Sequence, residues 1–196
     1  MGIVLPEGVF NNPSLRYVRE FVEDRAFIKA VVSLPQEAFV SSGAGVKASL
    51  LFLQKFTEEE KQQFDETYNK AKAEIKAKYS DEIAAETERL EKTILKSRND
   101  KKVETRKENQ MLLRDYLKRM NEKMARESRQ LLKNYLDYSI FVYEAEKVGI
   151  SASGEDDQNE LYPNDKQPEF IEKTCLELYK SFLDDNRLVS VLIRDD

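Results

Sequence analysis

The fold is decided by residues 2–55, which read GIVLPEGVFNNPSLRYVREFVEDRAFIKAVVSLPQEAFVSSGAGVKASLLFLQK. This stretch holds three short apolar runs bounded by proline or glycine, at residues 3–5, 30–34 and 46–53. Such runs are typical of strands buried on both faces of a sheet. Between the first two, Asn12 is placed as an N-cap and Pro13 as the first residue of a helix. Strand, helix and strand form a βαβ unit, so we expect the first two strands to run parallel.

The third strand should run antiparallel to the others. The loop before it, residues 35–45, is too short for a second helical crossover. Residues 1–56 are therefore predicted to form a three-stranded edge of an α/β sheet, too small to be a whole sheet of that class. The rest of the chain is predicted to be mainly helical.

The composition limits the classes of protein to consider. Of 196 residues, 40% are hydrophobic and 35% are charged, which is more polar than an ordinary compact domain and indicates long solvated helices or a disordered tract. The chain has no histidine, which excludes Ser–His and Cys–His arrangements and the commonest zinc ligand. Its single cysteine cannot form an internal disulfide, and it has no signal peptide and no apolar run of about 18 residues. A cytoplasmic location without a membrane span is expected.

A long helical hairpin is predicted over residues 57–134. Thr57 is followed by three glutamates, which is typical of a helix start, and no glycine or proline occurs from residue 48 to residue 148. Apolar residues recur at steps of three and four on both sides of a polar break at 96–100. This pattern indicates two antiparallel helices of about 39 and 47 residues. Residues 135–196 should form a helical segment that packs back on the sheet.

The two helices carry opposite net charges. Residues 57–95 hold 7 basic and 11 acidic side chains, whereas residues 96–134 hold 13 and 6. Attraction between the helices is the simplest explanation. The alternative is that the basic side chains near the turn bind nucleic-acid phosphates. These side chains are Lys96, Arg98, Lys101, Lys102, Arg106 and Lys107.

The last third is predicted to begin with a helix end at 140–149, stopped by Gly149, and to continue with a loop at 151–168. The acidic residues of this loop lack the spacing of a calcium site, so no metal is expected. Residues 188–193 are expected to form either a short final strand or simply the end of the chain's fold. An amphipathic helix at 169–183 should turn six side chains toward the core, with the cysteine packed there rather than acting as a nucleophile: Phe170, Ile171, Cys175, Leu178, Tyr179 and Phe182.

Short motifs assign no catalytic or cofactor-binding residue. The one glycine pair, Gly43 and Gly45, lies between two predicted strands and lacks the helix N-terminus that would hold a phosphate.

A resemblance to a known family extends this interpretation. The runs GIVLPEGVF, AVVSLPQEAF and GVKASLLFLQK, with an arginine-rich helix between the first two, resemble the adenine-N6 DNA methyltransferases. They are similar in particular to the modification subunit of type I restriction–modification systems. The resemblance returns at residues 140–161, where FVYEAEKVGI is followed by Asn-Glu-Leu. It makes residues 57–134 an insertion between two blocks.

In that family the matching strands are the last three of a seven-stranded sheet, and the final one is antiparallel and lies between its two predecessors. The resemblance thus implies the C-terminal edge of a Rossmann-like methyltransferase sheet. The loop before the last strand borders the target-base pocket, and Phe39 matches the aromatic residue that packs against the flipped adenine. The alternative is that Phe39 only caps the sheet edge.

Two family motifs, the S-adenosylmethionine-binding glycine loop and the Asn/Asp-Pro-Pro-aromatic motif, would precede these strands and have no match in this chain. The resemblance therefore implies a C-terminal piece that works with its N-terminal part, and we expect the chain alone to bind no S-adenosylmethionine and to be inactive. The implied partners are DNA and the specificity and restriction subunits. The alternative function is a non-catalytic helical hairpin that docks a partner subunit or a second copy of the chain.

Overall fold

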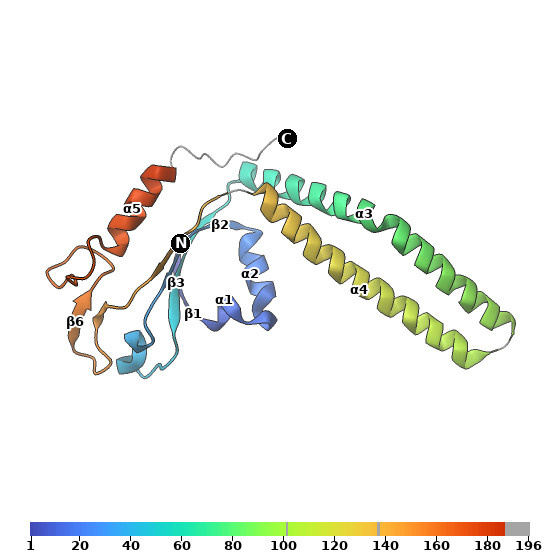
Figure 1. Ribbon diagram of the computed structural model, residues 1–196, viewed down its shortest axis with the longest axis horizontal. Coiled ribbons are helices and arrows are strands. Elements are labelled where there is room, and N and C mark those ends of the chain that lie inside the picture. The colour runs from blue at the N-terminus through green and yellow to red at the C-terminus, as the bar shows by residue number, and fades with distance from the viewer. Residues whose placement is uncertain (101, 137, 187–196) are drawn as a thin grey trace. The chain divides into compact units, whose positions relative to one another are not determined.

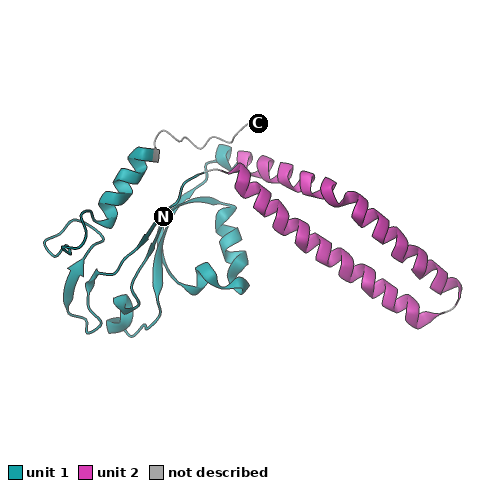
Figure 2. Cartoon of the chain, in the orientation of Figure 1, with its two compact units in different colours: residues 1–61, 138–192 teal, residues 62–137, 193–196 magenta. Residues whose placement is uncertain are grey.

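The computed structural model describes residues 1–100, 102–136 and 138–186. The chain divides into two compact units (Figure 2). Of the described residues, unit 1 comprises 1–61 and 138–186, and unit 2 comprises 62–100 and 102–136. Among the described residues, no helix combines the length and the apolar character needed to cross a bilayer.

Unit 1 is built on a four-stranded sheet with the strand order β1-β3-β2-β4 (Figure 1). Its strands are β1 (Gly2–Pro6), β2 (Ala26–Ser33), β3 (Ala48–Lys55) and β4 (Phe141–Glu144). β3 pairs antiparallel with both β1 and β2, and β4 pairs parallel with β2. The parallel direction of β1 and β2 and the antiparallel direction of β3 are thus confirmed. β1 and β2 are not neighbours, because β3 lies between them.

The connection from β1 to β2 is helical, as predicted. It consists of α1 (Gly8–Asn11), a 3-10 turn (η1, Pro13–Leu15) and α2 (Arg16–Glu23). The Asn12 side chain accepts a hydrogen bond of 2.9 Å from the Ser14 backbone N–H, which confirms the predicted cap.

The two faces of the sheet bury different clusters, because side chains alternate along each strand. One face packs Leu51 and Leu53 of β3 with Val22 of α2. On the other face, Ala30 and Val32 join a cluster with three further buried residues, Leu34, Phe141 and Cys175.

α5 (Cys175–Asn186) covers the part of the second face that is formed by β2 and β4. The rings of Tyr179 and Phe182 lie 5.3 and 5.6 Å from the ring of Phe141, measured between centroids. Cys175 is 7% exposed, so the inward positions predicted for these three α5 residues are confirmed.

The start of α5 differs from the prediction of a helix at 169–183. Both the N–H and the hydroxyl of Thr174 donate to Glu177 Oε2, at 2.8 and 2.7 Å, and this local bonding fixes the helix start at Cys175. Phe170 therefore precedes the helix and is 60% exposed. Leu178 is also exposed, at 36%, so the inward positions predicted for these two residues are wrong. Ile171, the sixth of these residues, is half-buried. The segment 188–193, for which a final strand was one expectation, lies outside the described residues.

The helix end predicted at 140–149 is wrong. This segment holds β4 and the start of a two-stranded hairpin formed by β5 (Val148–Ile150) and β6 (Asp156–Asn159). Gly149 lies inside β5 with a φ of 90° and stops no helix. The loop predicted at 151–168 is likewise interrupted by β6. The physical reason is the pairing of β4 with β2, which satisfies backbone groups that helical spacing would have paired locally.

Unit 2 is a hairpin of two long helices, as predicted: α3 (Glu58–Asn99), whose residues 58–61 belong to unit 1, and α4 (Val103–Tyr135). α3 begins with a reciprocal cap, in which Thr57 N–H donates to Glu60 Oε2 at 2.7 Å and Glu60 N–H donates to Thr57 Oγ1 at 3.2 Å. The helix continues through most of the polar patch at 96–100. α4 ends at Tyr135, which makes it shorter than predicted.

The two helices are joined by long side chains. Ile75 and Tyr79 of α3 are buried together with Met120 of α4. The Glu127 carboxylate accepts hydrogen bonds from Lys78 at 2.8 Å and from the Tyr79 hydroxyl at 2.7 Å, which together lower its pKa. This ion pair joins a lysine of the net acidic helix to a glutamate of the net basic one, so it is not an instance of the predicted attraction between their net charges.

Candidate functional site at the carboxyl edge of the sheet

The carboxyl ends of β1, β2 and β4 lie at one edge of the unit 1 sheet. These three strands run in the same direction, and β3 starts at the same edge because it runs in the opposite one. In open α/β sheets, ligands bind outside the carboxyl ends of the parallel strands. This edge is therefore the candidate functional site of unit 1.

A connected group of polar side chains occupies the edge. Ser49, near the start of β3, is 1% exposed and donates its hydroxyl hydrogen to Glu7 Oε2 at 2.9 Å. The Glu7 backbone N–H donates to the Lys47 carbonyl at 2.9 Å. Lys47 Nζ in turn lies 2.8 Å from Oε1 of Glu144, the last residue of β4. We call these four residues the edge cluster.

The charges of the edge cluster support one another. The hydrogen bond to Glu144 raises the pKa of Lys47, and the negative charge of Glu7 adds to this effect. The same hydrogen bond lowers the pKa of Glu144. Both groups therefore stay ionised near neutral pH, which suits the binding and orientation of a polar ligand better than proton transfer. Sequence reasoning missed this cluster, although Lys47 and Ser49 are the two polar residues within the apolar run at 46–53.

Phe39 lies beside this edge, in a 3-10 helix (η2, Gln36–Ser42) that follows β2. Its ring is half-buried against the cluster formed by the sheet and α5. Gly43, with a φ of 83°, ends the helix, and the Ala44 N–H donates to the Phe39 carbonyl at 3.0 Å. The turn between β5 and β6 supports η2 from outside, since a Cβ on Gly154 would lie 3.1 Å from that of Ser41.

Glu160 is a buried acid that sequence reasoning left in the acidic loop. It is 2% exposed, and its Oε2 accepts a hydrogen bond of 2.8 Å from the Tyr143 hydroxyl. Its Oε1 accepts one of 2.5 Å from the Lys147 N–H and a second from the Glu146 N–H. The carboxylate thus fixes the turn that follows β4. Burial, and then the bond to Glu160, raise the pKa of Tyr143.

Cys175 touches the same region through its backbone. Its N–H donates to the Glu160 carbonyl at 2.8 Å. Burial raises the pKa of its thiol to about 11. A thiol that stays protonated at neutral pH is a poor nucleophile, which agrees with its place in the core.

Two other acids of the same segment pair with lysines. Lys147 lies 3.0 Å from Asp157, and Lys166 lies 2.8 Å from Asp156. In the part of the chain that the structure describes, no three acid, cysteine or histidine side chains are placed to hold a metal ion.

The basic residues predicted to bind phosphate gather at the turn of the hairpin in unit 2. Lys101 lies outside the described residues. Of the others, Arg106 is half-buried and the remaining four are exposed. Within the described residues, none of their side chains takes part in an ion pair, and Arg106 Nε is buried without a hydrogen-bond partner. We call them the basic tip: Lys96, Arg98, Lys102, Arg106 and Lys107.

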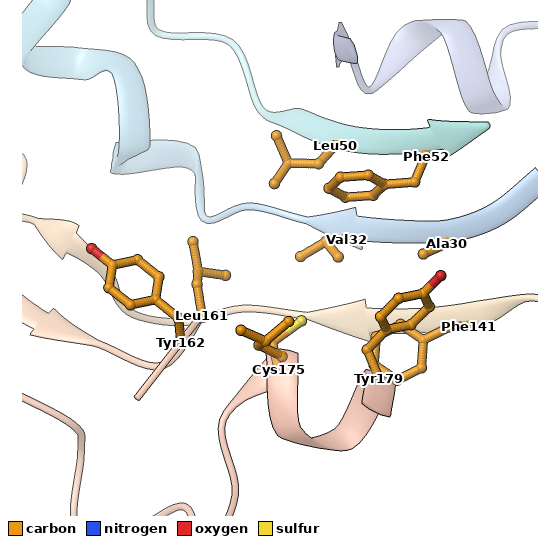
Figure 3. Close-up of a pocket in the computed structure, with 10 residues that line it drawn as sticks. Ala30, Val32, Leu50, Phe52, Phe141, Leu161, Tyr162, Cys175 and Tyr179 are labelled. Carbon is orange, nitrogen blue, oxygen red and sulfur yellow. The ribbon is translucent and has the colours of Figure 1, made fainter. Parts of the chain in front are cut away.

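An apolar cavity of about 340 Å³ lies between the sheet of unit 1 and α5. Figure 3 shows Leu50 and Phe52 of β3 on one side of it and Cys175 and Tyr179 of α5 on the other. Phe52 is 40% exposed, and Val4, the β1 partner of Leu50, is 51% exposed. The sheet therefore carries uncovered apolar surface from this cavity to β1.

The family model described as N-6 DNA Methylase matches residues 1–130. Among curated proteins, none matches the chain.

Proposed function

Because the chain belongs to the N-6 DNA methylase family, we propose that it forms the C-terminal part of the catalytic sheet of a DNA adenine-N6 methyltransferase. That methyltransferase would be the modification subunit of a type I restriction–modification system. The intact enzyme would transfer the methyl group of S-adenosylmethionine to the N6 amine of an adenine in DNA. This chain would supply one wall of the base pocket and a DNA-contacting hairpin.

The observation that carries the proposal is the order β1-β3-β2 with β3 antiparallel between two parallel strands. This arrangement places η2, and with it Phe39, beside the edge cluster at the carboxyl ends of the strands. A base flipped out of a duplex needs an aromatic or apolar face to replace its lost stacking. In our proposal Phe39 provides that face, and the edge cluster holds the segments on either side of it.

The open edge of β1 supports a partner for the sheet. Among the described residues, β1 pairs with β3 alone, so the backbone groups of its other edge are unpaired. Ile3 and Val4 on this strand are 40% and 51% exposed. An exposed apolar edge strand is a site for the addition of another strand. We assign this edge to the N-terminal part of the methyltransferase, which would carry the S-adenosylmethionine loop and the Asn/Asp-Pro-Pro-aromatic motif.

The basic tip supports a contact with DNA phosphates, and residues 57–134 would then be an insertion that reaches along the duplex. The specificity and restriction subunits complete the proposed set of partners. Four of the five basic side chains of the tip are exposed, and side chains without an internal ion pair can each replace a counterion on the DNA backbone without first breaking such a pair.

Two titrations of the purified chain test the proposal. Calorimetry with S-adenosylmethionine should show no heat, whereas fluorescence anisotropy with a labelled duplex should show binding that weakens with salt. Changing the five basic-tip residues to glutamine should lower the slope of log K against log salt concentration by up to about 4.5, at roughly 0.9 for each lost phosphate contact.

The matched control for the second titration is Lys118→Gln/Arg119→Gln, which removes two exposed charges from α4 away from the tip. A control that lowers the slope by as much per charge as the tip variant would refute the role of the tip. One-to-one micromolar binding of S-adenosylmethionine would place a cofactor site in residues that we assign to structure, and would refute the proposed division of the enzyme.

A further inference from the structure

A groove of about 790 Å³ runs along one side of the hairpin in unit 2, between α3 and α4. Small side chains from both helices line it, namely Ser80 and Ala84 of α3 and Ala125 and Ser128 of α4. Ile83 and Met124, both half-buried, add apolar surface. Small residues allow a further helix to approach closely, so this face can accept one packed at the usual 8–10 Å between helix axes.

The charges that line the groove are ordered along α3. Lys72 and Lys76 lie toward its N-terminal end, and Glu88 and Glu91 lie toward its C-terminal end. The positions are nearly symmetric about residue 82, because 72 and 91, and likewise 76 and 88, lie at almost equal distances from it. At a rise of 1.5 Å per residue the outer pair is separated by about 29 Å and the inner pair by about 18 Å.

This order makes α3 complementary to itself. When two α3 helices lie antiparallel with their centres at residue 82, each Lys72 faces a Glu91 and each Lys76 faces a Glu88. The twofold axis repeats both contacts, which gives four oppositely charged pairs. Interfaces of this isologous kind are the commonest among homodimers.

The side chains concerned are in place to make these contacts. All four are exposed. Lys72 lies over the Tyr68 ring at 3.7 Å, and Glu88 lies 2.6 Å from Lys92, so both are held along the helix surface. Lys76 and Glu91 take part in no ion pair among the described residues.

We propose that the α3–α4 groove binds the α3 helix of a second copy of this chain, antiparallel and about a twofold axis near residue 82. The floor of small and apolar residues supplies the packing, and the ordered charges select the antiparallel register. This inference does not depend on the proposed methyltransferase function.

Charge reversal tests the interface in the full chain. Lys72→Glu/Lys76→Glu and Glu88→Lys/Glu91→Lys each place like charges across the axis, and like charges that face each other disfavour association. We expect the wild-type chain to be a dimer in sedimentation equilibrium and each variant to dissociate at least about tenfold more readily. The two variants mixed together should form a dimer again, because every reversed lysine then faces a reversed glutamate.

The matched control is Lys118→Glu/Arg119→Glu, which changes the net charge as much as the first variant at exposed positions outside the groove. Circular dichroism confirms that each variant keeps its helix content, and recovery on mixing cannot come from misfolded chains. A monomeric wild-type chain up to millimolar concentration, an equal effect of the control, or no recovery on mixing would each overturn the proposal.

Discussion

Replacing Glu160 with glutamine should loosen the turn after β4 without unfolding unit 1. The carboxylate accepts hydrogen bonds from Tyr143, Glu146 and Lys147 in a site where it is 2% exposed. Glutamine keeps the shape and one acceptor oxygen. Its amide nitrogen takes the place of Oε2 and can donate to the Tyr143 hydroxyl, which is able to rotate and accept.

The expected cost follows from the loss of charge in these three bonds. A hydrogen bond to a charged group contributes about 1.5–3 kcal/mol and a neutral one about 0.5–1.5 kcal/mol. The difference is about 1 kcal/mol for each bond, and part of it is offset because the neutral amide is easier to bury. We therefore expect a net cost of about 2 kcal/mol for Glu160→Gln. Glu160→Ala leaves three donors unsatisfied and should cost about 4 kcal/mol.

Amide hydrogen exchange measures this effect locally. A loss of 2 kcal/mol should speed the exchange of residues 145–148 about thirtyfold in Glu160→Gln, because the exchange rate follows the free energy of local opening. Tyr143→Phe removes one bond to the carboxylate and leaves the other two; at about 1.5–3 kcal/mol for that bond, it should by itself speed exchange at least about tenfold. Hairpin residues 110–125 report on unit 2 and should not change. Exchange at 145–148 within about threefold of wild type in Glu160→Gln would refute the role of the carboxylate as the clamp of this turn.

Two further predictions concern groups with raised pKa values. Burial and the bond to Glu160 raise the pKa of Tyr143 above 10.0, so its neutral form is the one stabilised by folding. The neutral Tyr143 side chain contributes fully to the free energy of unfolding below about pH 10, and this contribution is lost as pH rises through the pKa of the folded state. The stability of unit 1 should therefore fall at alkaline pH, and it should fall by less in Tyr143→Phe. Denaturation curves from pH 8 to pH 11 check this, and an equal fall in both proteins would contradict it. Cys175 is the one cysteine of the chain, and its thiol has a pKa of about 11. It should therefore react with iodoacetamide at pH 8 at least about tenfold more slowly in the folded chain than in urea. Equal rates in the two conditions would contradict its burial.

The N-terminal strands could be predicted from the sequence because their signals are local. Each apolar run is bounded by proline or glycine, and the Asn12–Pro13 pair fixes the start of η1 within the helical connection. The position of β3 between β1 and β2 is different. It depends on pairing between residues that are far apart in the chain, so it followed only from the family resemblance.

The segment at 140–149 shows why local patterns failed farther along. A strand of four residues, such as β4, is too short for a period of two to stand out against steps of three and four. Val142 fits the helical series that runs through α4, yet it is 72% exposed on a strand whose neighbour Phe141 is 9% exposed. The segment forms a strand because it pairs with β2, and the residues within the segment do not by themselves predict that pairing.

The polar residues of the candidate site escaped prediction for a related reason. Ser49 and Glu160 are 1% and 2% exposed, although their residue types are usually found at the surface. Burying such groups is unfavourable unless each finds a hydrogen-bond partner, and here the partners are Glu7 and Tyr143, which lie 42 and 17 residues away in the chain. Each polar group in an apolar strand or beside one therefore needs a distant partner. The bonds from Ser49 to Glu7 and from Lys47 to Glu144 thus connect the ends of β1 and β4 to the start of β3 at one edge of the sheet. Phe39 lies beside this edge.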